Sequence, residues 1–169
     1  MKKKILAVLL LFAVCSRLSA GTGIGIQMGV IPPLFRIDAA QTVSATVRTD
    51  RIPFVFSAKI QLCDWKFSGA GFTADMWLAN PVIGRSIIHF FYGPGATLMY
   101  LPNIDRSGFS QVTQLFAAPR FAVGMNCFLT DFAEAYTQIA VEPGVVFHEE
   151  DGVKFRICFP IEAGIRIWF

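Results

Sequence analysis

The sequence predicts an all-β fold, an eight-stranded antiparallel up-and-down transmembrane β-barrel. Hydrophobic residues make up 54% of the 169 residues and charged residues only 16%, whereas an average soluble domain has roughly 25% charged residues. After Ala20 no apolar run is long enough for a membrane-spanning helix, which needs about 20 residues. Apolar and polar residues instead alternate with a period of two, which indicates β-strands with different surroundings on their two faces.

Residues 1–20 are expected to form a cleaved secretory signal peptide. Positions 2–4 are lysines, the apolar run 5–14 has the length of a signal-peptide core, and small residues precede the expected cleavage after Ala20. Cys15 raises the alternative of a lipoprotein signal. Val14 argues against this alternative, because lipoprotein sites prefer Gly, Ala or Ser before the cysteine.

Cleavage would leave residues 21–169 as one β-barrel domain. It would remove four of the 15 basic residues and none of the 12 acidic ones, which gives the mature chain a formal charge of −1. No basic surface then remains to indicate a nucleic-acid partner. The remaining cysteines, Cys63, Cys127 and Cys158, are odd in number and fit neither a disulfide framework nor a metal motif. We interpret them as small apolar strand residues.

The clearest strand is the last one. From Val153 to Phe169 every odd position is apolar, whereas the even positions include four charged residues. Such a strand separates two different environments. Pro160 interrupts the pattern and predicts a bulge or irregularity, because proline cannot donate a hydrogen bond to a neighbouring strand.

Seven further segments repeat this alternation, with Gly and Pro between them. The expected strands lie near 22–31, 42–49, 53–64, 70–79, 86–100, 116–130, 133–148 and 153–169. Bacterial outer-membrane barrels have an even number of antiparallel strands of about ten residues. A closed barrel also satisfies the backbone hydrogen bonds in lipid without leaving an edge. The longest connections, 32–41 and 101–115, fall at one end of this barrel, as expected for external loops.

An eight-stranded barrel has an interior just wide enough for side chains, so inward charged groups must find partners. The alternation places five basic and four acidic residues on the inner face, which favours a plug of ion pairs over a wide pore. These residues are Lys59, Asp75, Arg120, Glu134, Glu142, Lys154, Arg156, Glu162 and Arg166.

Assumed loop centres predict which inner residues face each other. The predicted facing pairs are Lys59 with Asp75, Glu134 with Arg166, Gln138 with Glu162 or, after a two-residue shift, Glu142 with Arg156. The first pair assumes a loop centred on Phe67, and the next two assume that residues 149–151 close the last hairpin. At least one carboxylate–cation contact within about 4 Å is expected.

The terminal sequence Ile161-x-Ala163-x-Ile165-x-Ile167-Trp168-Phe169, with the strand count and the signal peptide, resembles small bacterial outer-membrane barrels of the OmpX, OmpW and OmpA-transmembrane type. The resemblance implies contact with outer-membrane lipid and recognition by the barrel-assembly machinery during insertion. On this resemblance, Ile165, Ile167 and Phe169 would form the assembly signal.

No catalytic residue, metal site or cofactor is predicted. Ser86 and His89 point to opposite faces of one expected strand, and the acidic turn 149–151 beside His148 lacks the ligand spacing of a calcium loop. The glycines in 21–25 follow a cleavage site and open no helix, so they are not a nucleotide-binding motif.

The favoured function is that of a non-enzymatic outer-membrane protein. It would be a structural or surface-exposed barrel, with loops 32–41 and 101–115 available to a host or surface ligand, or a narrow conduit for small solutes. Two alternatives remain open. One is an outer-membrane lipid-modifying enzyme, and the other is a soluble periplasmic lipocalin-like barrel with an apolar interior.

Overall fold

The computed structural model describes residues 21–32, 39–78, 87–104, 111–148 and 152–169. The expected signal peptide 1–20 lies outside the described residues, as do the central parts of both long loops. Within the described part of the chain, no helix has the length and apolarity needed to cross a membrane.

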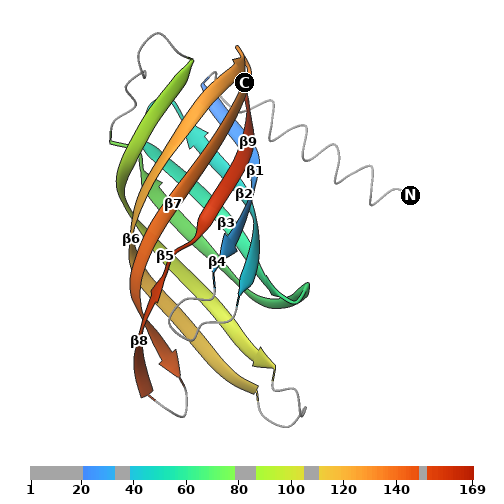
Figure 1. The fold of residues 1–169 in the computed structure, drawn as a ribbon, viewed down its shortest axis with the longest axis vertical. Coiled ribbons are helices and arrows are strands. Elements are labelled where there is room, and N and C mark those ends of the chain that lie inside the picture. Colours follow the sequence, from blue (N-terminus) through green and yellow to red (C-terminus); the bar gives the residue numbers. More distant parts are fainter. Residues whose placement is uncertain (1–20, 33–38, 79–86, 105–110, 149–151) are drawn as a thin grey trace, which may run out of the picture.

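The strands form one closed antiparallel barrel (Figure 1). They are β1 (Thr22–Ile31), β2 (Ala40–Thr49), β3 (Phe54–Cys63), β4 (Lys66–Met76), β5 (Ile88–Ile104), β6 (Gln111–Thr130), β7 (Ala133–His148), β8 (Gly152–Cys158) and β9 (Ile161–Trp168). Pairing of β6 with β7 and of β1 with β9 closes the sheet. Because β8 and β9 both pair with β7 and follow each other in the chain, they are two parts of one strand. The predicted eight-stranded barrel is therefore confirmed.

The last strand is interrupted where the sequence predicts an irregularity. Strand β8 ends at Cys158 and β9 begins at Ile161, with Phe159 and Pro160 between them. The carbonyl of Pro160 still accepts a hydrogen bond from the Ala140 amide at 3.0 Å. The proline thus breaks the ladder but leaves β8 and β9 on the same neighbour.

A tight turn corrects one predicted register. Strands β3 and β4 are joined at Asp64 and Trp65, whose φ angles of 50° and 63° suit a two-residue hairpin turn. The turn therefore lies nearer the N-terminus than the assumed loop centre. As a result Lys59 lies opposite Gly71, and the predicted facing of Lys59 and Asp75 is wrong.

The predicted loop 101–115 is also too long. Strand β5 continues to Ile104 and β6 begins at Gln111, and their residues are paired throughout these extensions. Only residues 105–110 separate the two strands. The segment 101–115 contains a proline, a glycine and many polar residues, a composition typical of a loop, and this composition hid the strand extensions.

The outer surface of the barrel is apolar and the interior is largely polar. Outward residues such as Ile26 and Phe72 are each 67% exposed. Buried apolar residues form two small clusters inside, one with Met99, Leu101 and Phe116, the other with Trp77 and Phe91. Charged and amide side chains fill the interior between them. This distribution is the reverse of a soluble domain with an apolar core.

Two prolines face each other in the barrel wall. Pairing between β6 and β7 stops after Ala117 and resumes at Phe121 without a change of register, which places Pro119 opposite Pro143. Neither proline nitrogen carries a hydrogen to donate. The wall therefore lacks part of its backbone hydrogen bonding here, and side chains must help to hold β6 to β7.

Inward glycines make room for bulky neighbours. A Cβ atom at Gly164 would lie 2.6 Å from the ring of Tyr136, closer than packed atoms tolerate. We expect Gly164→Val to lower the free energy of unfolding by about 1–3 kcal/mol through overpacking. Urea unfolding in detergent micelles would measure the loss. The control Ala163→Val introduces the same side chain on the exposed outer face, and an equal loss in both variants would contradict this explanation.

Candidate functional site

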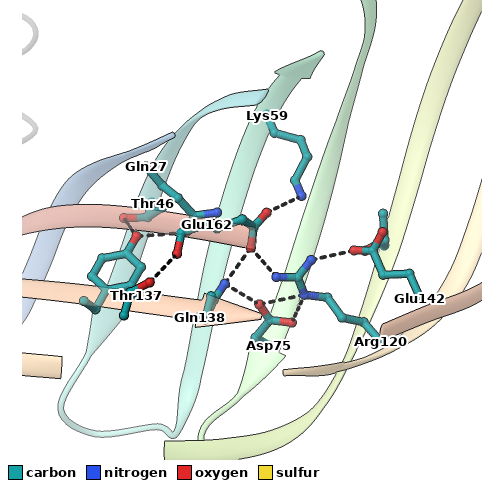
Figure 2. Close-up of polar contacts among 11 residues, drawn as sticks. Gln27, Thr46, Lys59, Asp75, Arg120, Thr137, Gln138, Glu142 and Glu162 are labelled. Atoms are coloured by element: carbon teal, nitrogen blue, oxygen red, sulfur yellow. Dashed lines mark hydrogen bonds and ion pairs between the residues drawn. The ribbon is translucent and has the colours of Figure 1, made fainter. Parts of the chain in front are cut away.

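Arg120 lies at the centre of a group of charged side chains that crosses the lumen (Figure 2). Its guanidinium contacts three carboxylates, namely Asp75 at 2.9 Å, Glu142 at 2.5 Å, and Glu162. A second cation, Lys59, donates to Glu162 at 3.0 Å. We call this group the Arg120 cluster; its residues are Lys59, Asp75, Arg120, Gln138, Glu142 and Glu162.

Five strands, β3, β4, β6, β7 and β9, supply the Arg120 cluster. Arg120 and Glu142 continue the register of β6 and β7, so they face each other directly beside the proline pair. Their ion pair therefore joins the two strands where backbone hydrogen bonds are missing. Gln138 donates to Glu162 at 2.7 Å, and the Thr97 hydroxyl of β5 donates to Glu142 at 2.7 Å.

The Arg120 cluster is almost fully shielded from solvent. The side chains of Arg120 and Glu162 are 0% exposed and that of Lys59 is 2% exposed. Removal of one partner from a buried ion pair is strongly destabilising, because the other charge is left uncompensated. The cluster is therefore suited to closing the lumen and cross-linking its walls.

A second group surrounds Glu134, nearer the end of the barrel where the strand connections 50–53 and 131–132 lie. Glu134 is 0% exposed and its carboxylate accepts four hydrogen bonds. The donors are Arg48 at 3.0 Å, Arg166 at 2.7 Å, Asn126 at 2.7 Å and Trp168 at 2.9 Å. We call these five residues the Glu134 cluster.

Aromatic rings pack against the two arginines of the Glu134 cluster. The guanidinium of Arg48 lies 4.3 Å from the centre of the Trp77 ring, and that of Arg166 lies 4.6 Å from the Tyr136 ring. Trp77 in turn stacks on Phe91 at 3.5 Å between centroids. Cation–π contacts of this kind stabilise a guanidinium that has lost its water.

Seven of the eight residues of the predicted lumen network are buried, at 4% exposure or less. They are Lys59, Asp75, Arg120, Glu134, Glu142, Glu162 and Arg166. The exception is Arg156, which is half-buried on β8. The structure separates the seven into the two clusters, with Arg166 and Glu134 in the second.

The predicted facing of Glu134 with Arg166 and of Gln138 with Glu162 is confirmed by the register of β7 and β9. The alternative, Glu142 facing Arg156, is wrong, since Arg156 lies opposite Gly144.

Lys154 does not lie inside the lumen, contrary to the predicted inward set. Its side chain is exposed on β8. Among the described strands β8 pairs only with β7, at the end of the barrel away from the C-terminus (Figure 1). The wall does not enclose its side chains there, which explains the exposure of Lys154 and the incomplete burial of Arg156.

Sequence reasoning missed several members of the Glu134 cluster. Arg48 alternates with the outward Val47 and Trp168 alternates with Ile167, so the period of two already placed both on the inner face. Asn126 follows the same rule on β6. Asn126 and Trp168 are uncharged, so an inner set made of charged residues does not include them.

Neither histidine forms a recognisable site. His89 packs edge-on against Phe128, with ring centroids 6.2 Å apart, and the side chain of His148 lies outside the described residues. In the described ranges, no group of three or more His, Cys, Asp or Glu residues is arranged to hold a metal ion. Ile165, Ile167 and Phe169 are exposed on the outer face, and their role in assembly stays a prediction.

Comparison with known proteins supports the fold through structure rather than sequence. No family model and no curated protein sequence matches the chain. The N-terminal β-barrel domain of Pseudomonas aeruginosa OprF is similar, with 14% identity, a TM-score of 0.52, and coverage of 89% of this chain and all of that one. Neisserial surface protein A (NspA) is similar with 11% identity and a TM-score of 0.52, over 88% of this chain and 96% of that one. The chain thus has the fold of small eight-stranded outer-membrane barrels.

Proposed function

We propose that the chain is a non-enzymatic integral protein of the bacterial outer membrane, a surface-exposed structural barrel with a closed lumen. The observation that carries this proposal is the Arg120 cluster, which joins five strands across the interior. The apolar outer wall of the barrel is the second observation that supports it. Together they describe a barrel that lipid surrounds and that ion pairs fill.

The distribution of polarity supports the membrane location. Ile139, Ile165 and Phe121 are between 48% and 54% exposed on the outer face, a pattern that is unfavourable in water and favourable in hydrocarbon. A lipocalin-like barrel would have an apolar interior. The buried ion pairs of this interior therefore argue against that alternative.

The packing of the lumen supports a closed barrel over a conduit. The Arg120 cluster lies between two apolar clusters, one containing Met99 and Phe116 and the other containing Trp77 and Phe91. Passage of a solute would have to displace all three layers. A wide water-filled channel belongs to barrels with many more strands.

We further propose that any host or surface ligand binds at the end of the barrel that carries the connections 32–39 and 105–110. Both chain ends would then lie on the periplasmic side. On the same reasoning Ile165, Ile167 and Phe169, at the C-terminal end of β9, would be available to the barrel-assembly machinery during insertion.

Cell fractionation and electrophoresis test this proposal. We expect the protein in the outer-membrane fraction, and its gel mobility should change on heating because a closed barrel resists detergent until it is boiled. In planar bilayers the purified barrel should show no stepwise conductance. Recovery of folded, monomeric 21–169 from detergent-free buffer would contradict the membrane location, and regular conductance steps would contradict the closed lumen.

A further inference from the structure

The Glu134 cluster contains more positive than negative charge. Two guanidiniums, those of Arg48 and Arg166, share the single carboxylate of Glu134. Its other two members, Asn126 and Trp168, carry no charge. The cluster therefore has a formal charge of +1 in a place where Arg166 and Glu134 are fully buried.

Several donors in and around this cluster have no acceptor within the described chain. In Arg166, the side-chain Nε and Nη2 groups have no hydrogen-bond partner, although the residue is 0% exposed. The Nε of Arg48 and the indole nitrogen of Trp77 also lack one. Both guanidiniums lie within 5.5 Å of the centre of the Trp77 ring, so these donors belong to one small region.

An excess of negative charge lies in the Arg120 cluster, at a different level of the lumen. The Arg120 cluster has two cations, Lys59 and Arg120, and three carboxylates, so the charges of both clusters together cancel. Glu134 and Gln138 are four residues apart on β7, which corresponds to roughly 13 Å along a strand. The carboxylates of the Arg120 cluster are therefore too distant to accept hydrogen bonds from Arg166.

We propose that the Glu134 cluster binds one small inorganic anion, chloride being the simplest, between Arg166 and Arg48. A single negative charge matches the formal +1 of the cluster and supplies the acceptor that the buried N–H groups lack. The site is enclosed by aromatic rings, so it favours a compact halide over a bulky hydrated oxyanion. Arg48, with a side chain 15% exposed, connects the site to solvent.

Halide binding at this site requires neither conduction nor a particular cellular location. It depends only on the interior of the folded barrel. The inference and the proposed function can therefore fail separately.

The test is thermal unfolding of the mature barrel in detergent, with chloride replaced by gluconate at constant ionic strength. We expect chloride to raise the melting temperature by a few degrees, because a ligand that binds only the folded state stabilises it. Arg48→Met should abolish this dependence. It removes the excess charge, while Glu134 keeps Arg166, Asn126 and Trp168 as donors.

Arg51→Met is the matched control, since Arg51 is exposed in the connection between β2 and β3 and its loss changes the net charge equally. It should keep the full chloride dependence. Crystals soaked in bromide give a second measurement that does not depend on the variants, with an anomalous peak expected beside Arg166. The inference is overturned if chloride does not change the melting temperature of the wild-type barrel, if chloride changes it equally in both variants, or if no bromide lies at Arg166.

Discussion

Arg120→Met is expected to lower the free energy of unfolding by about 3–5 kcal/mol, as for other buried ion pairs that lose one partner. The substitution leaves the carboxylates of Asp75, Glu142 and Glu162 with Lys59 as their single cation. All of these side chains are 3% exposed or less. Water therefore cannot replace the guanidinium without entering the closed interior.

The same substitution also weakens the wall. Pro119 and Pro143 leave β6 and β7 without part of their backbone hydrogen bonding, and the Arg120–Glu142 ion pair joins the strands at that point. We therefore expect amide hydrogen exchange to accelerate in β6 and β7 on both sides of the prolines. Exchange between β2 and β3, whose ladder is continuous, should change much less.

Urea unfolding of the folded barrel in phospholipid vesicles would measure the loss of stability in Arg120→Met. Arg120→Lys is the control, because lysine keeps the charge but its single ammonium group cannot contact three carboxylates with the planar geometry of a guanidinium. The free energy of unfolding of this variant should lie between those of the wild type and Arg120→Met. If Arg120→Met were as stable as the wild type, the cluster would not be a structural element of the lumen.

The strands were predictable because two different environments impose a period of two on the sequence. The alternation from Val153 to Phe169 predicts the last strand, and Pro160 predicts its interruption. The same alternation gave the inner face, so Lys59 and Arg120 were assigned to the interior. These features depend on neighbours along the chain, which the sequence displays directly.

Contacts across the barrel were harder to predict because they depend on register. The facing of Glu134 and Arg166 followed from a hairpin closed at 149–151. The facing of Lys59 and Asp75 failed because a turn at Asp64 and Trp65 moved β4 along β3. Small errors in the position of a turn therefore become large errors in side-chain partners.

Arg120 and Glu162 illustrate a further limit of sequence reasoning. They lie on β6 and β9, which do not pair with each other, yet their side chains meet across the lumen. Strand pairing does not report such contacts. They follow from the closure and curvature of the whole barrel, and these are properties of the complete sheet.

Glu134→Leu should also lower the free energy of unfolding by about 3–5 kcal/mol. It removes the acceptor of four hydrogen bonds, and with it the carboxylate that Arg48 and Arg166 share. Leucine has a similar volume, so loss of packing is a minor cause. The main costs are two guanidiniums without their shared carboxylate and two further donors, on Asn126 and Trp168, without an acceptor.

A double-mutant cycle with Arg48→Met separates the charge from the other causes. If repulsion between the two uncompensated guanidiniums dominates, Glu134→Leu should cost less in the Arg48→Met background, because only Arg166 is then left without a carboxylate. Equal costs in both backgrounds would assign the loss to the remaining hydrogen bonds. Since Arg48 is the more exposed of the two arginines, we expect the single Arg48→Met variant to fold and the coupling to be measurable by urea unfolding in vesicles.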